Sequence, residues 1–269
     1  MLNDITFGQF IPSDSVVHKA DPRTKLALLV VFIVFVFLSN NPFSLGLMLV
    51  FLLVLIFASK IPFSMYIKNL KSILPIILFT SILNAFYIKT GTVLFDRWIF
   101  YITVDGVWRA VFMSTRISML ILSSAMFSYS STPTAITNGI ESLLKPLNRF
   151  GLESAIHTMA MTMTIALRFI PTLIEETQKI MNAQKARGAD MESGGLIKRI
   201  KAMLPILIPL LISSVRRAYD LAEAMECRCY NGGEGRTRLN KMRYSLVDLY
   251  ALILFVIVCV SSLVLNILF

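Results

Sequence analysis

The chain has 269 residues, of which 56% are hydrophobic and only 16% are charged, and its mean hydropathy is +0.71. These values exclude an ordinary soluble domain and indicate an integral membrane protein. The net charge of +10 does not indicate nucleic-acid binding here, because membrane proteins retain Lys and Arg in their cytoplasmic loops. The three cysteines, Cys227, Cys229 and Cys259, form no disulfide framework.

The N-terminal region predicts a short cytoplasmic segment followed by a transmembrane hairpin. Residues 1–25 are polar and end in Asp21-Pro22-Arg23-Thr24-Lys25, where Asp21 suits a helix cap and Pro22 a first helical turn. No cleavable signal peptide is expected, because the first apolar run starts after these residues and lacks a small-residue cleavage site. The runs Leu26–Ser39 and Phe43–Ala58 are each shorter than the roughly 20 residues that a span usually needs. Together they still predict a tight transmembrane hairpin with an uncharged outer turn.

Three further apolar runs predict three more spans, at Ser72–Ile88, Val107–Tyr129 and Val247–Phe269. Residues 90–106 are rich in aromatic and β-branched residues and carry glycines at both ends, which predicts a short β-hairpin at the outer interface. Basic residues follow the second span and precede the last one, so these ends are expected inside: Lys60, Lys68, Lys71, Arg236, Arg238, Lys241 and Arg243.

The region between the fourth and fifth spans predicts two long helices that do not cross the membrane. Their apolar runs, Ala155–Leu167 and Ala202–Val215, hold about 13 or 14 residues each, which is too short for a span. Pro171 in the first helix, and Pro205 and Pro209 in the second, can bend the helices so that they lie obliquely at the membrane surface.

Beyond the prolines both helices become amphipathic, and the two apolar stripes are expected to pack on each other where the helices cross. The first stripe contains Leu173, Ile174, Thr177, Ile180, Met181 and Gln184, with Glu175, Glu176, Lys179 and Lys185 opposite. The second stripe contains Val215, Ala218, Tyr219, Ala222 and Met225, with Arg216, Asp220, Glu223 and Glu226 opposite.

Each long helix ends on an arginine that lies between two small residues. The first ending is Ala186-Arg187-Gly188, and the second is Cys227-Arg228-Cys229, followed by Asn-Gly-Gly. Glycines at these places signal a helix C-terminus. A purely local role is one explanation, because the helix dipole favours a cation in the last turn by ~0.3–1 kcal/mol. Docking onto a partner protein is the other, because small neighbours leave the guanidinium free to form forked bonds with a carboxylate or with helix-end carbonyls.

Three segments make the sequence similar to a known family: residues 183–190 (AQKARGAD), residues 224–230 (AMECRCY) and residues 21–26 (DPRTKL). They resemble the T subunit (EcfT) of energy-coupling factor transporters, and the likeness covers nearly the whole chain. The second arginine segment departs from the Ala-Arg-Gly pattern of the family, because cysteines flank its arginine. Both replacements are small, so docking is expected to survive.

The resemblance implies a non-enzymatic scaffold that needs no cofactor. It assigns docking onto two ATP-binding cassette ATPase subunits to Ala186, Arg187, Gly188, Cys227, Arg228 and Cys229. It also implies a substrate-binding S subunit held at the membrane face, for the uptake of a vitamin or metal ion across a prokaryotic cell membrane. ATP is expected to bind elsewhere, because this chain has no glycine-rich phosphate loop.

The predicted fold class is an all-α integral membrane protein with about five transmembrane helices, long cytoplasmic or interfacial coupling helices and a short outer β-hairpin. The predicted organisation is a membrane part at 1–130, a coupling-helix region at 131–246 and a final transmembrane helix at 247–269. The N-terminus is expected in the cytoplasm.

Several residues leave alternatives open. A self-sufficient secondary permease would need internal repeats and midplane ionisable groups, of which only Arg116 is present. A membrane enzyme would need converging His, Asp or Glu residues, which the sequence does not show.

Cys227 and Cys229 do not predict a metal site, since they diverge on a helix and have no nearby His. A run of methionines at 159, 161 and 163 fits either ordinary packing or a pliable surface for different S subunits.

Overall fold

The computed structural model describes residues 10–87, 93–97, 100–151, 153–189, 195–232 and 244–268. The chain divides into two compact units. The membrane unit consists of Gly8–Gly139 and Lys241–Phe269, and the crossed-helix unit consists of Met1–Phe7 and Ile140–Asn240. Asp190 of the first arginine segment and the basic residues expected between 236 and 243 lie outside the described residues.

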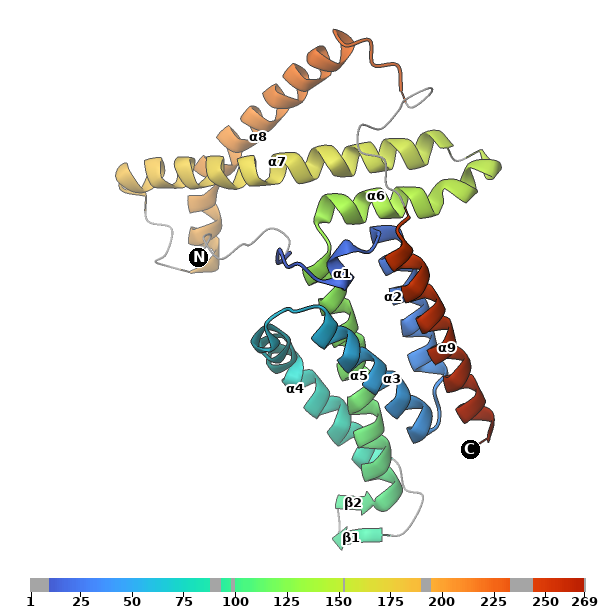
Figure 1. Ribbon diagram of the computed structural model, residues 1–269. Helices are drawn as coiled ribbons and strands as arrows, with labels where there is room; N and C mark the ends of the chain where they lie inside the picture. The colour runs from blue at the N-terminus through green and yellow to red at the C-terminus, as the bar shows by residue number, and fades with distance from the viewer. Residues whose placement is uncertain are drawn as a thin grey trace. The chain divides into compact units, whose positions relative to one another are not determined.

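The membrane unit contains helices α1 (Val16–Lys19), α2 (Pro22–Leu38), α3 (Pro42–Ala58), α4 (Phe63–Tyr87), α5 (Val104–Ser130) and α9 (Leu246–Leu268) (Figure 1). Helix α6 (Pro133–Leu144) begins in this unit and ends in the other. Proline opens α2, α3 and α6, where its missing N–H costs no hydrogen bond. Strands β1 (Val93–Arg97) and β2 (Phe100–Thr103) pair antiparallel.

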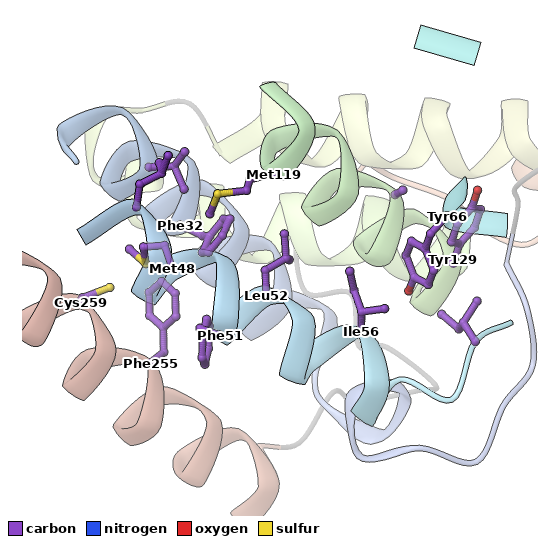
Figure 2. Close-up of a cluster of buried hydrophobic side chains, with 14 residues drawn as sticks. Phe32, Met48, Phe51, Leu52, Ile56, Tyr66, Met119, Tyr129, Phe255 and Cys259 are labelled. Atoms are coloured by element: carbon purple, nitrogen blue, oxygen red, sulfur yellow. The ribbon is translucent and has the colours of Figure 1, made fainter. Parts of the chain in front are cut away.

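Helix α3 lies at the centre of the membrane unit's hydrophobic core. Its buried side chains recur every three or four residues, so that one face of the helix is covered: Leu45, Met48, Phe51, Leu52 and Ile56. Side chains from four neighbouring helices join the cluster, with Phe32 from α2, Tyr66 from α4, Met119 from α5 and Phe255 from α9 (Figure 2). The rings of Phe51 and Phe255 lie 5.8 Å apart, which joins α3 to α9.

Helices α4 and α5 approach closely because small residues line their contact. Gly106, Ala110 and Ser114 recur at every fourth position of α5, a spacing that lets membrane helices pack tightly. A Cβ atom on Gly106 would lie only 2.8 Å from the carbonyl oxygen of Ala85 on α4. The hydroxyls of Ser81 and Ser114 lie 2.9 Å apart and form a polar link between the same two helices.

The turn between α2 and α3 is held by polar groups from α5 and α9. The guanidinium of Arg116 donates a hydrogen bond to the carbonyl oxygen of Ser39 and lies 5.0 Å from the centre of the Phe112 ring. Ser44 forms a 2.7 Å hydroxyl contact with Ser262 and donates to Ser39 at 2.9 Å. Arg116 therefore links α5 to the C-terminus of α2, where the last carbonyls of a helix have no hydrogen-bond partner within the helix.

The number of spans expected from the sequence is wrong. Among the described residues, three helices are long and apolar enough to cross a membrane: Phe63–Phe86, Val104–Ser130 and Leu246–Leu268. Helices α2 and α3 have 17 residues each. At 1.5 Å per residue they extend about 25 Å, which is less than the ~30 Å of a hydrocarbon core. The fold class with about five transmembrane helices is thus corrected to a mainly α-helical membrane protein with three helices of spanning length.

The crossed-helix unit is built from two long helices, α7 (Glu153–Ala186) and α8 (Leu196–Glu226), with the short 3-10 helix η1 (Lys145–Phe150) before them. Helix α7 has 34 residues and continues through Pro171, and α8 has 31 residues and continues through Pro205 and Pro209. The two helices cross, and their ends diverge from the crossing (Figure 1).

Candidate functional site

The first arginine segment forms a complete C-terminal stop for α7. The N–H of Gly188 donates to the carbonyl of Lys185 at 3.0 Å, and the N–H of Ala189 donates to the carbonyl of Gln184 at 3.0 Å. Gly188 has a φ of 86°, in the left-handed region that glycine adopts without a steric penalty. This pair of bonds around a left-handed residue is the Schellman motif.

The second arginine segment ends α8 with the same motif, although it has no glycine at the left-handed position. The N–H of Cys229 donates to the carbonyl of Glu226 at 2.8 Å, and the N–H of Tyr230 donates to the carbonyl of Met225 at 3.0 Å. Cys229 itself has a φ of 55°. A non-glycine residue pays about 1–2 kcal/mol for this conformation. The surrounding structure therefore holds Cys229 in a strained state in order to end α8 at this residue.

Arg187 and Arg228 consequently occupy equivalent positions, each directly before the left-handed residue. Both side chains are exposed. Backbone N–H groups bind the carbonyls of Gln184 and Lys185 at the first end and those of Met225 and Glu226 at the second. Within the parts of the crossed-helix unit that the structure describes, neither guanidinium has an ion pair or a side-chain hydrogen bond. Both guanidinium groups are thus exposed at the ends of their helices.

The crossing of α7 and α8 contains a polar contact that the sequence pattern did not predict. Glu176 of α7 accepts hydrogen bonds from two residues of α8: Ser213 donates to Oε1, and Arg217 donates to Oε2. The sequence pattern placed Glu176 on the outward face and expected the apolar stripes to meet. Helices that cross touch over only a few residues, so most of the α8 stripe stays uncovered, with Val215 50% and Tyr219 74% exposed.

A second contact joins the end of α8 to the first half of α7. The Tyr230 hydroxyl donates to the sulfur of Met161 at 2.9 Å. Tyr230 follows Arg228 by two residues, so the ring braces the second arginine end against α7. Met159 and Met163, two residues to either side of Met161 on α7, are 40% and 45% exposed.

The cysteines beside Arg228 are exposed free thiols. In the described ranges, no group of three His, Cys, Asp or Glu side chains is placed to hold a metal ion.

The third segment, Asp21 to Lys25, lies where several elements of the membrane unit meet. The Asp21 side chain accepts the N–H of Arg23 at 2.9 Å and so caps α2. The Lys25 amine donates to the carbonyls of Ser130 at 3.0 Å and His18 at 3.3 Å. Burial lowers the pKa of Lys25 to about 8, against the opposing attraction of Asp248 and Asp21.

Two more contacts tie this segment to the chain that leads toward the crossed-helix unit. Gly139 of α6 packs against Pro22, since a Cβ atom on it would lie 3.5 Å from the Pro22 carbonyl carbon. The Arg23 guanidinium lies 5.8 Å from the centre of the Tyr244 ring. The segment thus contacts both stretches of the membrane unit that continue into the other unit.

Comparison with known proteins identifies the family. The model of the cobalt transport protein family, CbiQ, matches residues 13–239. The energy-coupling factor transporter transmembrane protein EcfT of Ruminiclostridium cellulolyticum is 45% identical over 248 residues, which cover 92% of this chain and 92% of the relative. The chain belongs to the EcfT family. The EcfT proteins of Clostridium kluyveri and Bacillus subtilis are 46% and 40% identical, over 98% and 92% of this chain and 97% and 93% of their own lengths.

The family resemblance expected from the three segments is thereby confirmed, and the chain is a transmembrane component of an energy-coupling factor transporter. Sequence reasoning found the two arginine ends of this EcfT chain but missed Arg217 and Asp248. Asp248 had a detectable signal, because Ser245-x-x-Asp248 before an apolar run is the pattern of a capping box. Arg217 had no such signal, because Arg216 and Arg217 are adjacent and the sequence does not show which of them faces α7.

Proposed function

We propose that this EcfT chain couples two cytoplasmic ATP-binding cassette ATPase subunits to a substrate-binding S subunit, and that Arg187 and Arg228 are its points of attachment to the ATPases. The observation that carries the proposal is the identical Schellman ending of α7 and α8. Two helices of different sequence place one exposed arginine each at the same position of the same motif, and the second helix does so at the cost of a left-handed cysteine.

The chemistry of attachment follows from the guanidinium group. Arginine presents donors in a planar fork that matches a carboxylate or a set of helix-end carbonyls. The small neighbours Ala186, Gly188, Cys227 and Cys229 leave room for the walls of a groove around each arginine. Two separated arginines fit two ATPase subunits better than one, because the ends of α7 and α8 diverge from their crossing (Figure 1).

The chain itself carries out no reaction in this proposal. ATP binding and hydrolysis move the ATPase subunits, α7 and α8 carry the movement, and the S subunit at the membrane face releases a vitamin or a metal ion. The coupling-helix region and the N-terminus then lie in the cytoplasm of a prokaryotic cell, and the spans lie in its cell membrane.

The test is to replace Arg187 and Arg228 by alanine, singly and together, in the assembled transporter. Each single variant is expected to weaken ATPase binding by about 2 kcal/mol, the level of an interface hot spot, and the double variant to abolish ATP-driven uptake. Arg216→Ala is the matched control, because Arg216 is an exposed arginine in the body of α8. A double variant that still binds both ATPases and supports uptake would overturn the proposal. Retained copurification of the S subunit shows that the variants are folded.

A further inference from the structure

The contact between Glu176, Ser213 and Arg217 is here called the clasp. It joins the two arginine-tipped helices within the crossed-helix unit. Both carboxylate oxygens of Glu176 are engaged, one by each donor. Ser213 and Arg217 are one helical turn apart on α8, so Glu176 holds α8 at two points along its axis. A contact at two points restrains rotation of one helix about the other, which a single bond does not.

The clasp lies at equal chain distance from the two arginine ends. Arg187 follows Glu176 by eleven residues, and Arg228 follows Arg217 by eleven residues. Eleven residues make about three full helical turns and about 16 Å of helix. Each arginine is therefore nearly in phase with the clasp residue of its own helix, and the two arms from the crossing to the arginines have the same length.

We infer that Glu176 and Arg217 are positioning residues that set the separation and angle of the two coupling arginines. This inference rests on the proposed function of Arg187 and Arg228. With an arm of about 16 Å, a 10° rotation at the crossing moves an arginine by about 3 Å. A forked hydrogen bond tolerates about 0.5 Å of misplacement. The clasp thus acts on docking through the geometry of the helix pair and touches neither ATPase.

The half-buried state of the clasp fits a positioning role. The side chains of Arg217 and Glu176 are 35% and 20% exposed, so water screens their attraction only partly. Ile212 and Val215 beside it on α8 are 57% and 50% exposed. Glu176 and Arg217 form an ion pair between α7 and α8.

The decisive measurement is the distance between the two helix ends in the full chain, reconstituted in lipid nanodiscs. Nitroxide labels are attached at Ala183→Cys and Ala224→Cys, exposed positions one turn before each arginine, in a background with Cys227→Ala, Cys229→Gly and Cys259→Ala. Glu176→Gln and Arg217→Gln are expected to broaden and shift the distance distribution. The charge swap Glu176→Arg with Arg217→Glu is expected to narrow it again.

The matched controls are Glu175→Gln and Arg216→Gln, which remove the same charges from exposed neighbouring positions. Clasp variants with the same distance distribution as these controls would overturn the inference. In the assembled transporter, the clasp variants should bind the ATPases more weakly and lose about two- to thirtyfold in ATP-driven uptake, the range of typical coupling changes. If Arg187 and Arg228 prove dispensable while the distance still depends on the clasp, the proposed function fails and the positioning of the helix ends stands.

Discussion

The carboxylate of Asp248 accepts the backbone N–H of Asp21 at 2.7 Å, across 227 residues of chain. Its other oxygen accepts the N–H of Ser245 at 2.8 Å, which is one half of a capping box at the start of α9. Asp248 is only 4% exposed. One buried side chain therefore orders the beginnings of both α2 and α9, at the side of the membrane unit where Lys25 also binds.

Replacing Asp248 by asparagine should destabilise the membrane unit by about 1–3 kcal/mol, because an amide has one acceptor oxygen and leaves the N–H of Asp21 or of Ser245 without its acceptor. Thermal unfolding of the chain in nanodiscs measures the effect. Asp105→Asn is the control, since Asp105 also lies in the first turn of a helix but is exposed. A change of less than about 0.5 kcal/mol is expected there. Equal midpoints for the two variants would contradict the role given to Asp248.

Stability should rise with pH across the range in which Lys25 loses its proton. Its pKa is about 8 in the folded chain, against 10.5 for an unperturbed lysine. Between these values the unfolded state binds more protons than the folded state, so the free energy of unfolding increases with pH. Below about pH 8 both states are protonated, and this dependence disappears.

Lys25→Met should remove the rise, whereas Lys60→Met, which alters an exposed lysine, should leave it in place. Asp248→Asn should lower the pKa of Lys25 further, because the attraction of Asp248 opposes the effect of burial. The measurement is the unfolding midpoint from pH 7 to pH 10.5. A rise of the same size in the Lys25 variant would assign it to another group.

The residues that could be predicted from the sequence are those whose partners are close in the chain. Asp21 and Pro22 opened α2 as expected, and Gly188 ended α7. Asp248 and Asp21 could not be paired in this way, because a hydrogen bond across 227 residues depends on the packing of α2 against α9. Glu176 was misplaced for a related reason: helical periodicity separates an apolar face from a polar one but does not show which part meets a partner helix.

The predicted number of spans was wrong for a different reason. The apolar runs before Ser39 and after Pro42 have the composition of membrane helices, but each helix ends after 17 residues. Composition alone does not distinguish a span from a buried helix of this length. In the folded chain only one face of α3 is buried in the core, while the apolar side chains of Val50, Val54 and Phe57 are exposed.

A side chain at Gly106 should disrupt the packing of α4 on α5. Its Cβ atom would lie 2.8 Å from the backbone oxygen of Ala85 and 3.0 Å from the Thr103 hydroxyl, so the helices must separate. Gly106→Ala is expected to cost about 1–3 kcal/mol, as overpacking does. Gly46→Ala in α3 is the control, because no atom lies within 4 Å of the added group. Thermal unfolding of both variants checks this, and a stable Gly106 variant would argue against the close approach.

The two arginine ends should respond in opposite directions to changes at their left-handed residues. Gly188→Ala places a methyl group at a φ of 86° with no atom within 4 Å, so its cost is conformational alone. Cys229→Gly removes the strain of a cysteine at a φ of 55°. A difference of about 1 kcal/mol in each case corresponds to roughly a fivefold change in local opening.

Amide hydrogen exchange reports this opening directly, because the N–H groups of Ala189 and Tyr230 close the two motifs. Exchange at Ala189 should become about fivefold faster in Gly188→Ala, and exchange at Tyr230 about fivefold slower in Cys229→Gly. Gly195→Ala serves as the control, since Gly195 has a φ of −69° and open space around it. Unchanged exchange at Tyr230 would mean that Cys229 is not strained at its left-handed φ. Backbone strain would then no longer indicate that the Schellman motif at the end of α8 is kept for a function.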